Sequence, residues 1–312
     1  MQRPPAVLLM GPTGAGKTAL AVELVEHLPL EIVSVDAAMV YRGMDIGTAK
    51  PARELLARAP HHLIDLIDPA ESYSAARFLA DATRVMREIA ARGRTPLLAG
   101  GTMLYFRALQ SGLAQLPAAN AAIRRRLEAR AAAEGWPALH AELRQLDPAA
   151  AARIGPGDRQ RIQRALEVIE LIGGPISTRQ REDLRGASSG RDLCLVLAPA
   201  NRALLYERLA LRFEDMMRRG LLDEVRRLHA RPDLHAGLPA MRLIGYRQLW
   251  NHLDGGSSIE AAVQKAIVAT RQLARRQLTW LRAEPGAIGF DPEDRQTPGQ
   301  VAARIAQWQG GG

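Results

Sequence analysis

Gly11-Pro12-Thr13-Gly14-Ala15-Gly16-Lys17-Thr18 fits the pattern G-x-x-x-x-G-K-[ST] at each of its fixed positions. The flanking residues also fit, because 6–10 is a short apolar run suited to a buried strand and 18–28 carries leucines at helical spacing. A strand that feeds a glycine-rich turn and a helix directs backbone N–H groups and the helix dipole at one anion. Lys17 would bring a positive charge to the terminal phosphates, and the Thr18 hydroxyl is placed to bind Mg²⁺. The stretch predicts a site for a compound with two or more phosphates.

Strands and helices alternate along the first part of the chain. Apolar runs at 31–35, 62–67 and 95–99 predict three further strands, and Ser74 predicts the N-cap of a long helix between the last two. Strands that alternate with helices of ten or more residues indicate βαβ units. We therefore expect an α/β fold with a parallel sheet.

This topology would gather distant residues, because ligands bind at the carboxyl ends of parallel strands. The motif at 11–18, Asp36 and Gly100–Thr102 should meet there. Asp36 is suited to accept a proton from an attacking nucleophile, but an aspartate that caps a turn or lies in the second shell of Mg²⁺ fits the local sequence equally well. Thr102 could turn its hydroxyl toward the same cleft, although Gly-Gly-Thr is also an ordinary turn from strand to helix.

The alternation stops between 117 and 185, where the pattern is helical and is interrupted by glycine and proline. The segment 186–190 is predicted to be a flexible joint, after which a strand-like run returns to the first domain. We expect a P-loop α/β core with an inserted helical domain. The expected parts are the first half of the core at 1–116, the insertion at 117–188, and core completion with basic C-terminal helices at 189–312.

Positive charge dominates the chain and is concentrated in its C-terminal part. The net charge is +9, and 202–282 holds 15 Lys+Arg against 8 Asp+Glu. A basic balance in a phosphate-binding protein favours a polyanionic partner. Arginine and glutamine at 159–164 and along 271–282 suit phosphate and base contacts in nucleic acid. The alternative is a solvated face, which is the usual fate of a charge run.

Composition excludes several classes of protein. No run approaches the ~18 apolar residues of a membrane span, and Met1 leads almost directly into the first strand, which leaves no room for a signal peptide. The single cysteine, Cys194, excludes an intrachain disulfide and a multi-cysteine zinc site. We expect a soluble cytoplasmic protein with no membrane partner, and a monomer.

A second P-loop motif is missing. Hydrolases of this class usually have an apolar strand ending in an aspartate that helps to hold Mg²⁺, whereas the strand at 96–99 ends in Gly-Gly-Thr. The run 63–68 is a possible substitute, but its alternating aspartates are typical of a strand end and turn. The absence argues against an ATPase motor and leaves a small-molecule kinase open.

Further motifs match a known family in order and spacing. They include Ser34-Val35-Asp36, the segment 40–51, Gly100–Tyr105, Gly245–Gln248 and Thr270–Ala274. Through them the chain resembles the bacterial tRNA dimethylallyltransferases, which prenylate N6 of the adenine just 3′ of the anticodon. Many proteins share the P-loop, but the 40–51 segment and Gly-Gly-Thr-Met-Leu-Tyr are specific to this family.

The resemblance implies a reaction for the phosphate site. The P-loop would hold the diphosphate of dimethylallyl diphosphate rather than ATP, with Mg²⁺ at the end of the motif. Pyrophosphate would leave under electrostatic stabilisation, which needs no hydrolytic water and explains the missing acid. Asp36 has the family's position for the base that deprotonates the adenine amine, Thr102 would position the reacting groups, and Lys17 would assist the leaving group. Arg212, with Arg208 one helical turn earlier, would pair with diphosphate oxygens.

The resemblance also implies that the target adenine leaves its stack, and that the insertion and the basic C-terminal helix hold the tRNA anticodon stem-loop from two sides. Position 37 is Ala where the family usually has Ser, so we expect a weaker contact to the nucleotide and the same reaction. The residues expected to face tRNA are Asp36, Ala37, Ala38, Met39, Thr102, Arg124, Gln160, Arg161, Ile162, Gln163, Arg164, Met241, Arg242, Leu243, Ile244, Gly245, Tyr246, Arg271, Arg275 and Arg276.

Two other function classes remain as alternatives. A nucleotide kinase, or an adenylate isopentenyltransferase acting on free AMP, would have no use for the insertion or the basic C-terminal segment. A non-catalytic RNA-binding protein that keeps the P-loop for regulation would not need Asp36 and Thr102 at the phosphates.

Overall fold

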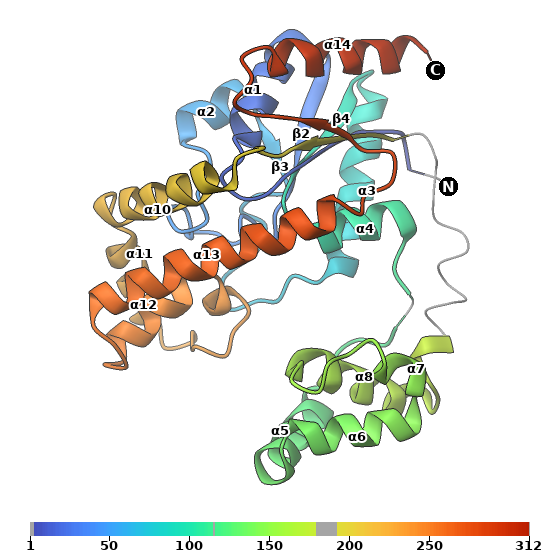
Figure 1. The fold of residues 1–312 in the computed structure, drawn as a ribbon, viewed down its shortest axis with the longest axis vertical. Helices are drawn as coiled ribbons and strands as arrows, with labels where there is room; N and C mark the ends of the chain where they lie inside the picture. The colour runs from blue at the N-terminus through green and yellow to red at the C-terminus, as the bar shows by residue number, and fades with distance from the viewer. Residues whose placement is uncertain (1–2, 115, 179–191, 312) are drawn as a thin grey trace. The chain divides into compact units, whose positions relative to one another are not determined.

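The computed structural model describes residues 3–114, 116–178 and 192–311 (Figure 1). The chain forms two compact units, a core unit of 1–107 with 189–312 and a helical unit of 108–188. The helical unit begins at Ala108, inside a helix of the first part, whereas the sequence predicted an insertion from 117. The joint predicted at 186–190 lies outside the described residues.

A parallel sheet of six strands forms the centre of the core unit. β1 pairs with β4 on one side and with β5 on the other, so that Val7 lies between Leu97 and Leu193. The predicted α/β fold with a parallel sheet is confirmed. The sheet order is β3-β2-β4-β1-β5-β6, with β1 at Val7–Met10, β2 at Leu30–Val35, β3 at His61–His62, β4 at Thr95–Gly100, β5 at Leu193–Leu197 and β6 at Ile288–Phe290.

Helices cover both faces of this sheet. The connections from β1 to β2 and from β3 to β4 run across it in opposite directions, so right-handed crossovers place α1 (Lys17–His27) and α3 (Ala75–Ala91) on opposite faces. On the first face, α1 and α14 (Thr297–Gly310) share a buried cluster with the strands that includes Leu24, Leu195 and Val301. The N-terminus of α1 is thereby fixed at the end of β1.

The third strand is shorter than the sequence predicted. Only His61 and His62 pair with β2, although the apolar run continues to Ile67. Leu63 and Asp65 adopt left-handed backbone, with φ of 63° and 53°, which ends the ladder. Ile67 returns for a single bridge to Tyr41.

The C-terminal half of the core unit is helical, as predicted. The predicted N-cap Ser74 accepts a hydrogen bond from the Arg77 N–H, and Asn201 and Ser258 cap their helices in the same way by accepting from the N–H groups of Ala203 and Ala261. From the sequence, no helix was expected at 53–58, 246–253 or 297–310, where the structure has one. The remaining helices of this unit are α2 (Arg53–Arg58), α4 (Met103–Ser111), α10 (Arg202–Arg218), α11 (Leu221–His229), the 3-10 turn η1 (Ala240–Arg242), α12 (Tyr246–Leu253) and α13 (Ile259–Leu281).

Helices within the described residues pack together as the core of the helical unit. They are α5 (Ala121–Glu134), α6 (Trp136–Leu146), α7 (Pro148–Ala151) and α8 (Arg159–Ile172). Leu139, Leu143, Ile162 and Val168 are fully buried between them. Within the described ranges, no helix of either unit combines the length and apolar composition needed to cross a membrane.

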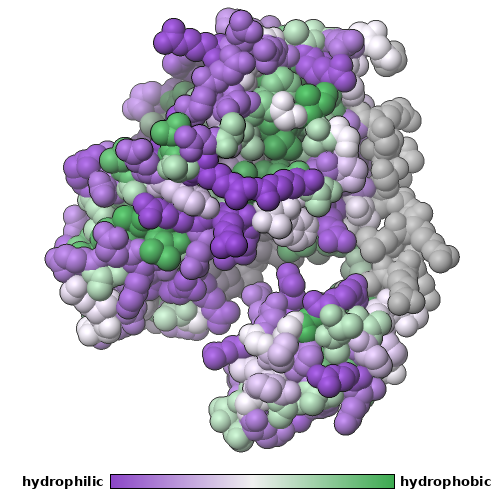
Figure 2. Space-filling view, in the orientation of Figure 1, coloured by the Kyte–Doolittle hydropathy of each residue, from purple (hydrophilic) through white to green (hydrophobic). Residues whose placement is uncertain are grey.

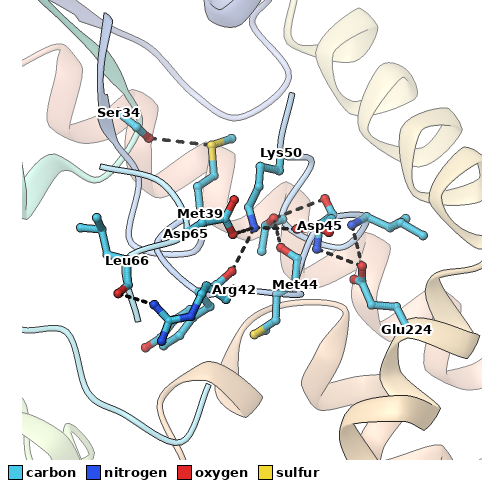
Figure 3. Close-up of polar contacts among 12 residues, drawn as sticks. Ser34, Met39, Arg42, Met44, Asp45, Lys50, Asp65, Leu66 and Glu224 are labelled. Atoms are coloured by element: carbon cyan, nitrogen blue, oxygen red, sulfur yellow. Dashed lines mark hydrogen bonds and ion pairs between the residues drawn. The ribbon is translucent and has the colours of Figure 1, made fainter. Parts of the chain in front are cut away.

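A buried glutamate fixes the loop of residues 40–51 against the C-terminal helices (Figure 3). Glu224 of α11 is 2% exposed, and its carboxylate accepts the backbone N–H groups of residues 45, 46 and 47 at 2.9, 2.9 and 3.1 Å. It also accepts the Tyr246 O–H at 2.6 Å, and burial with this neighbouring charge raises the Tyr246 pKa well above its usual value. All four donors meet one side chain, so the loop's shape depends on Glu224.

Lys50 is a second buried charged residue of the loop at 40–51, and its contacts hold separate parts of that loop together. Lys50 donates to the Tyr41 carbonyl at 2.9 Å and to the carboxylates of Asp45 and Asp65 at 2.6 Å each. Asp65 belongs to the 63–68 run that could have replaced the missing hydrolase acid. Its carboxylate instead neutralises Lys50 (Figure 3).

Replacing Glu224 by glutamine tests this clamp. An amide offers one acceptor oxygen, so its NH₂ group would face N–H donors and leave at least one of them unpaired, at about 1–3 kcal/mol each. We expect Glu224→Gln to lower the free energy of unfolding in urea by about 2 kcal/mol or more. Tyr246→Phe removes only one of the four bonds and should cost about 1 kcal/mol. Equal losses from the two variants would contradict the clamp.

Candidate active site

The turns that follow β1, β2 and β4 meet at the carboxyl edge of the sheet. They approach so closely that a Cβ on Gly100 would lie 2.1 Å from the carbonyl oxygen of Val35. Thr102 joins two of the turns, because its N–H donates to the Val35 carbonyl at 3.2 Å and its Oγ1 accepts the Ala37 N–H at 3.1 Å. The P-loop, Asp36 and the Gly100–Thr102 turn are therefore brought together, as the topology predicted.

The P-loop presents backbone N–H groups to a cavity of about 350 Å³. Gly14 and Gly16 both have φ of 79°, a left-handed conformation that glycine adopts without strain. Gly16 is the N-cap of α1 and provides no side-chain cap, so the first-turn N–H groups are available to an anion. The lining includes Thr13, Gly14, Gly16, Lys17, Thr18, Ser34, Asp36, His61, Gly101 and Arg212. We call this space the phosphate cavity.

Two cations and one carboxylate set the charge of the phosphate cavity. Burial lowers the pKa of Lys17 most, the Asp36 carboxylate raises it and Arg212 lowers it, with a net value of about 8. Lys17 Nζ meanwhile donates to the Pro12 carbonyl at 2.7 Å. Burial also lowers the pKa of Arg212, which Asp36 partly offsets, and the guanidinium stays charged at neutral pH. An anion entering here would relieve the repulsion between Lys17 and Arg212.

Asp36 stands where the phosphate cavity meets a second cavity. Its Oδ1 accepts the Ala38 N–H at 2.8 Å, which fixes the carboxylate after β2. The second cavity has a volume of about 520 Å³, and its walls include Leu209, Phe213 and Leu243. We call it the apolar cavity. The residues that line both cavities are Thr13, Asp36, Thr48, Ala49, Gly101, Arg212 and Gln277.

The structure separates the two arginines that were predicted to act as a pair. Arg212 lines both cavities. Arg208 lies one turn earlier on α10, is exposed, lines neither cavity, and pairs with Glu293. The structure therefore gives no support to the predicted contact of Arg208 with a diphosphate.

The residues predicted to face RNA in the core unit differ in accessibility. Met241 and Tyr246 are fully buried, so their side chains are not available to a surface ligand. The neighbouring Arg242, Leu243 and Ile244 line the apolar cavity, together with Ala37, Ala38 and Thr102. Gly245 is buried, and Met39 lines the phosphate cavity.

The arginines of α13 lie on the more exposed side of that helix. Arg275 and Arg276 are exposed, and Arg276 also lines the apolar cavity. Arg271 is half-buried, and its Nε is enclosed without a hydrogen-bond partner among the described residues. Hydrophilic side chains predominate over α13 in Figure 2, which suits contact with a charged partner.

Several residues predicted to face RNA in the helical unit already have partners within that unit. Arg124 donates to Glu167 at 2.9 and 3.0 Å, and Arg164 donates to the same buried carboxylate at 2.8 Å. Ile162 is fully buried in the core of the unit. Gln163 donates to the Arg124 carbonyl and to Glu128, whereas Gln160 and Arg161 are exposed.

Two residues that line the phosphate cavity, His61 and Gln277, had no predicted role there. His61 lines it, its Nδ1 lies 2.7 Å from the Ala59 carbonyl, and burial lowers its pKa. Gln277 is 7% exposed and contacts the P-loop, although its sequence context suggested an RNA contact. The signal that could have located it is its place on the apolar face of α13, between Ala274 and Leu281.

The low pKa of Lys17 predicts that anion binding depends on pH. Lys17 of the free protein loses its proton as the pH rises through about 8, and a neutral amine cannot attract an anion. The contribution of Lys17 to the affinity for inorganic pyrophosphate should fall by about tenfold per pH unit above that value. Calorimetry on the protein and on Lys17→Met measures this contribution as a ratio, which cancels the titration of pyrophosphate itself. A ratio constant from pH 7 to about 9.5 would contradict the shifted pKa.

Comparison with known proteins identifies the family. The protein-family model described as IPP transferase matches residues 39–284. The tRNA dimethylallyltransferase of Bordetella petrii is 57% identical over 305 residues, which cover 97% of each chain. The protein of the same name from Thioalkalivibrio sulfidiphilus is 57% identical, over 97% of this chain and 94% of that one.

Solved structures agree with the sequence comparison. The full-length tRNA isopentenylpyrophosphate transferase of Bacillus halodurans matches with a TM-score of 0.72 and 37% identity, over 97% of this chain and 96% of that one. A eukaryotic dimethylallyltransferase acting on tRNA shares the fold, with a TM-score of 0.81 at 24% identity over 97% of this chain and 78% of that one. The resemblance drawn from the motifs is confirmed, and the chain belongs to the IPP transferase family.

Proposed function

We propose that the chain transfers a dimethylallyl group from dimethylallyl diphosphate to N6 of the adenine 3′ of the anticodon in tRNA, releasing pyrophosphate. One observation carries this proposal: Asp36 and Arg212 line both the phosphate cavity and the apolar cavity. A substrate with a charged end and a hydrocarbon end fits such a pair, with its reactive carbon beside Asp36. The names of the relatives at 57% identity support the same reaction.

The diphosphate would lie against the P-loop. The N–H groups at the start of α1 would donate hydrogen bonds to its oxygens, and Lys17 and Arg212 would neutralise the charge that grows on the leaving pyrophosphate. Both cations are positioned before the substrate arrives, so little reorganisation accompanies the reaction. Stabilising a leaving group in this way requires no water activated for hydrolysis.

The donor set of the phosphate cavity fits Mg²⁺ that is held mainly by its substrate. Mg²⁺ keeps several waters and takes one or two protein oxygens together with phosphate oxygens. The Thr18 hydroxyl lines the cavity at the first turn of α1, and among the described residues no group of three or more His, Cys, Asp or Glu forms a separate cage. Thr18 would hold the ion, which would supply further neutralisation of the diphosphate.

The adenine amine would attack the allylic carbon from the side of Asp36. The N6 lone pair forms the new N–C bond while the C–O bond breaks and its electrons pass to the pyrophosphate. That lone pair is delocalised into the ring, so removal of the N6 proton by the Asp36 carboxylate would assist the attack. The Thr102 Oγ1 accepts the Ala37 N–H at 3.1 Å, so its O–H can donate to a substrate atom.

Anticodon stem-loop RNA would provide the flipped adenine. The exposed arginines of α13 and the residues Arg242 and Arg276 of the apolar cavity suit its phosphates, and exposed Gln160 and Arg161 would do the same from the helical unit. Ala37 offers only its backbone where the family usually has a serine hydroxyl, which should weaken one contact. The reaction would take place in the cytoplasm, where tRNA is found, and we expect a monomer to perform it.

An adenylate isopentenyltransferase acting on free AMP is the main alternative. It would use the same two cavities, since the chemistry at N6 is identical. The basic α13 and the helical unit favour RNA, because a free nucleotide is too small to reach beyond the cavities. A non-catalytic RNA-binding role does not account for Asp36 between them.

Exchange of Asp36 for asparagine tests the base. Asparagine keeps an acceptor for the Ala38 N–H but cannot take a proton at neutral pH, so kcat for label transfer from radiolabelled dimethylallyl diphosphate to stem-loop RNA should fall by about 10²- to 10⁴-fold. The KM values should change little. Asp223→Asn, which alters an exposed aspartate paired with Arg226, is the matched control. A kcat for Asp36→Asn within a factor of a few of the wild type would exclude Asp36 as the base.

Removal of the α13 arginines tests the RNA surface. RNA affinity falls with salt by a slope that grows by about 1 for each phosphate contact. Arg275→Ala with Arg276→Ala should weaken stem-loop binding and reduce this slope by about 2. Arg77→Ala with Arg84→Ala removes two exposed arginines of α3 that line neither cavity and should leave the slope unchanged. If both pairs had the same effect, α13 would not be the RNA surface.

A further inference from the structure

One side chain of α13 reaches the centre of the phosphate site. Gln277 is 7% exposed, and its Oε1 accepts the Thr13 N–H at 2.9 Å while its Nε2 donates to the Gly101 carbonyl at 2.7 Å. A single planar amide thus joins the P-loop to the turn after β4. The contact is close, because a Cβ on Gly101 would lie 2.5 Å from the Gln277 Nε2.

Each of the two bonds constrains a group next to the reaction. The bond to Thr13 fixes the N–H that precedes the anion-binding part of the P-loop and directs it away from the anion. The bond to Gly101 fixes the peptide that precedes Thr102, whose Oγ1 accepts the Ala37 N–H beside Asp36. Gln277 therefore constrains the backbone both at the diphosphate site and beside Asp36.

Docking of α13 does not require this amide. Ala274 and Leu278, on the same face of the helix, pack with Leu205 and Leu209 of α10 in a buried apolar cluster. Apolar packing of this kind is enough to hold a helix of 23 residues. The buried amide is thus not needed to hold α13 in place. Its two hydrogen bonds instead fix the positions of the two loops.

The same helix carries the exposed groups that suit RNA. Arg276 precedes Gln277, and Trp280, one turn later, is 42% exposed and lies 5.8 Å from the Arg107 guanidinium. A ligand that orders this stretch of α13 would also order the Gln277 amide. Ordering the amide would in turn fix the P-loop N–H groups, which reduces the entropy lost when an anion binds.

We infer that Gln277 is a positioning residue that links the RNA-facing helix to the diphosphate site. Through its two hydrogen bonds, RNA on α13 strengthens diphosphate binding at the P-loop, and diphosphate strengthens RNA binding by the same factor. This inference rests on the proposed function for the identity of the two ligands. It adds the side chain through which their sites are coupled.

Gln277→Met tests the link with pyrophosphate and Mg²⁺ as the probe. Methionine matches glutamine in length and keeps the apolar packing but makes neither bond, so the Kd for pyrophosphate should rise by about 5- to 10-fold. In the wild type, saturating stem-loop RNA should lower that Kd, and in Gln277→Met the effect of RNA should be lost. Gln300→Met is the matched control, because Gln300 is exposed on α14 and lines neither cavity, and it should behave as the wild type does.

Gln277→Glu gives a second test, which is the pH dependence of the affinity for pyrophosphate. This dependence would not change if Gln277 only stabilised the fold. The introduced carboxylate can accept the Thr13 N–H but cannot donate to Gly101, and its charge repels pyrophosphate. Protonation restores the donor and removes the charge, so the affinity of this variant relative to the wild type should recover as the pH falls toward about 4.5.

Two results would overturn the inference. One is a pyrophosphate Kd for Gln277→Met within twofold of the wild type, and the other is an RNA effect of equal size in both proteins. Failure of the wild type to bind pyrophosphate at all would instead contradict the proposed function. A wild-type protein that binds pyrophosphate with no effect of RNA would contradict the coupling alone.

Discussion

The backbone of three loops must come together at the end of the sheet, and the active site depends on that close approach. The glycines at 100 and 101 allow it, since a Cβ at either would lie within 2.5 Å of a neighbouring atom. Thr102 and Gln277 then hydrogen-bond the loops to one another. The result is a concentration of N–H donors and cations at one point, with Asp36 at its rim.

The parallel sheet and the meeting of the P-loop with Asp36 and Thr102 could be predicted from the sequence because both depend on local patterns. The P-loop is read from eight consecutive residues, and the rule that ligands bind at strand ends then brings in Asp36 and Thr102. The left-handed residues that end β3 could not be read in this way, since leucine rarely adopts that conformation and aspartate adopts it only in some turns. The predicted boundary of the insertion differs from that of the helical unit because α4 runs from one unit into the other.

The role of individual side chains was harder to predict, because it depends on what packs around each position of a helix and not on the helix pattern alone. Arg208 and Arg212 are one turn apart, yet only Arg212 lines a cavity. Tyr246 was expected to face tRNA, but it is buried and donates its O–H to the buried Glu224. Polar side chains on the apolar face of a helix, such as Gln277, are the signal that a single sequence offers for such contacts.

In the proposed reaction, the phosphate cavity would retain the leaving pyrophosphate, while the apolar cavity would admit the allyl chain and the adenine. The central claim is that the acceptor is an adenine in RNA. Its most direct test is a competition in which the protein, Mg²⁺ and radiolabelled dimethylallyl diphosphate meet stem-loop RNA and free AMP together, followed by digestion of the RNA and chromatography of the nucleosides. We expect the label on N6 of the adenine 3′ of the anticodon. Label on AMP, with none in the RNA, would contradict this account and leave a small-molecule prenyltransferase on the same fold.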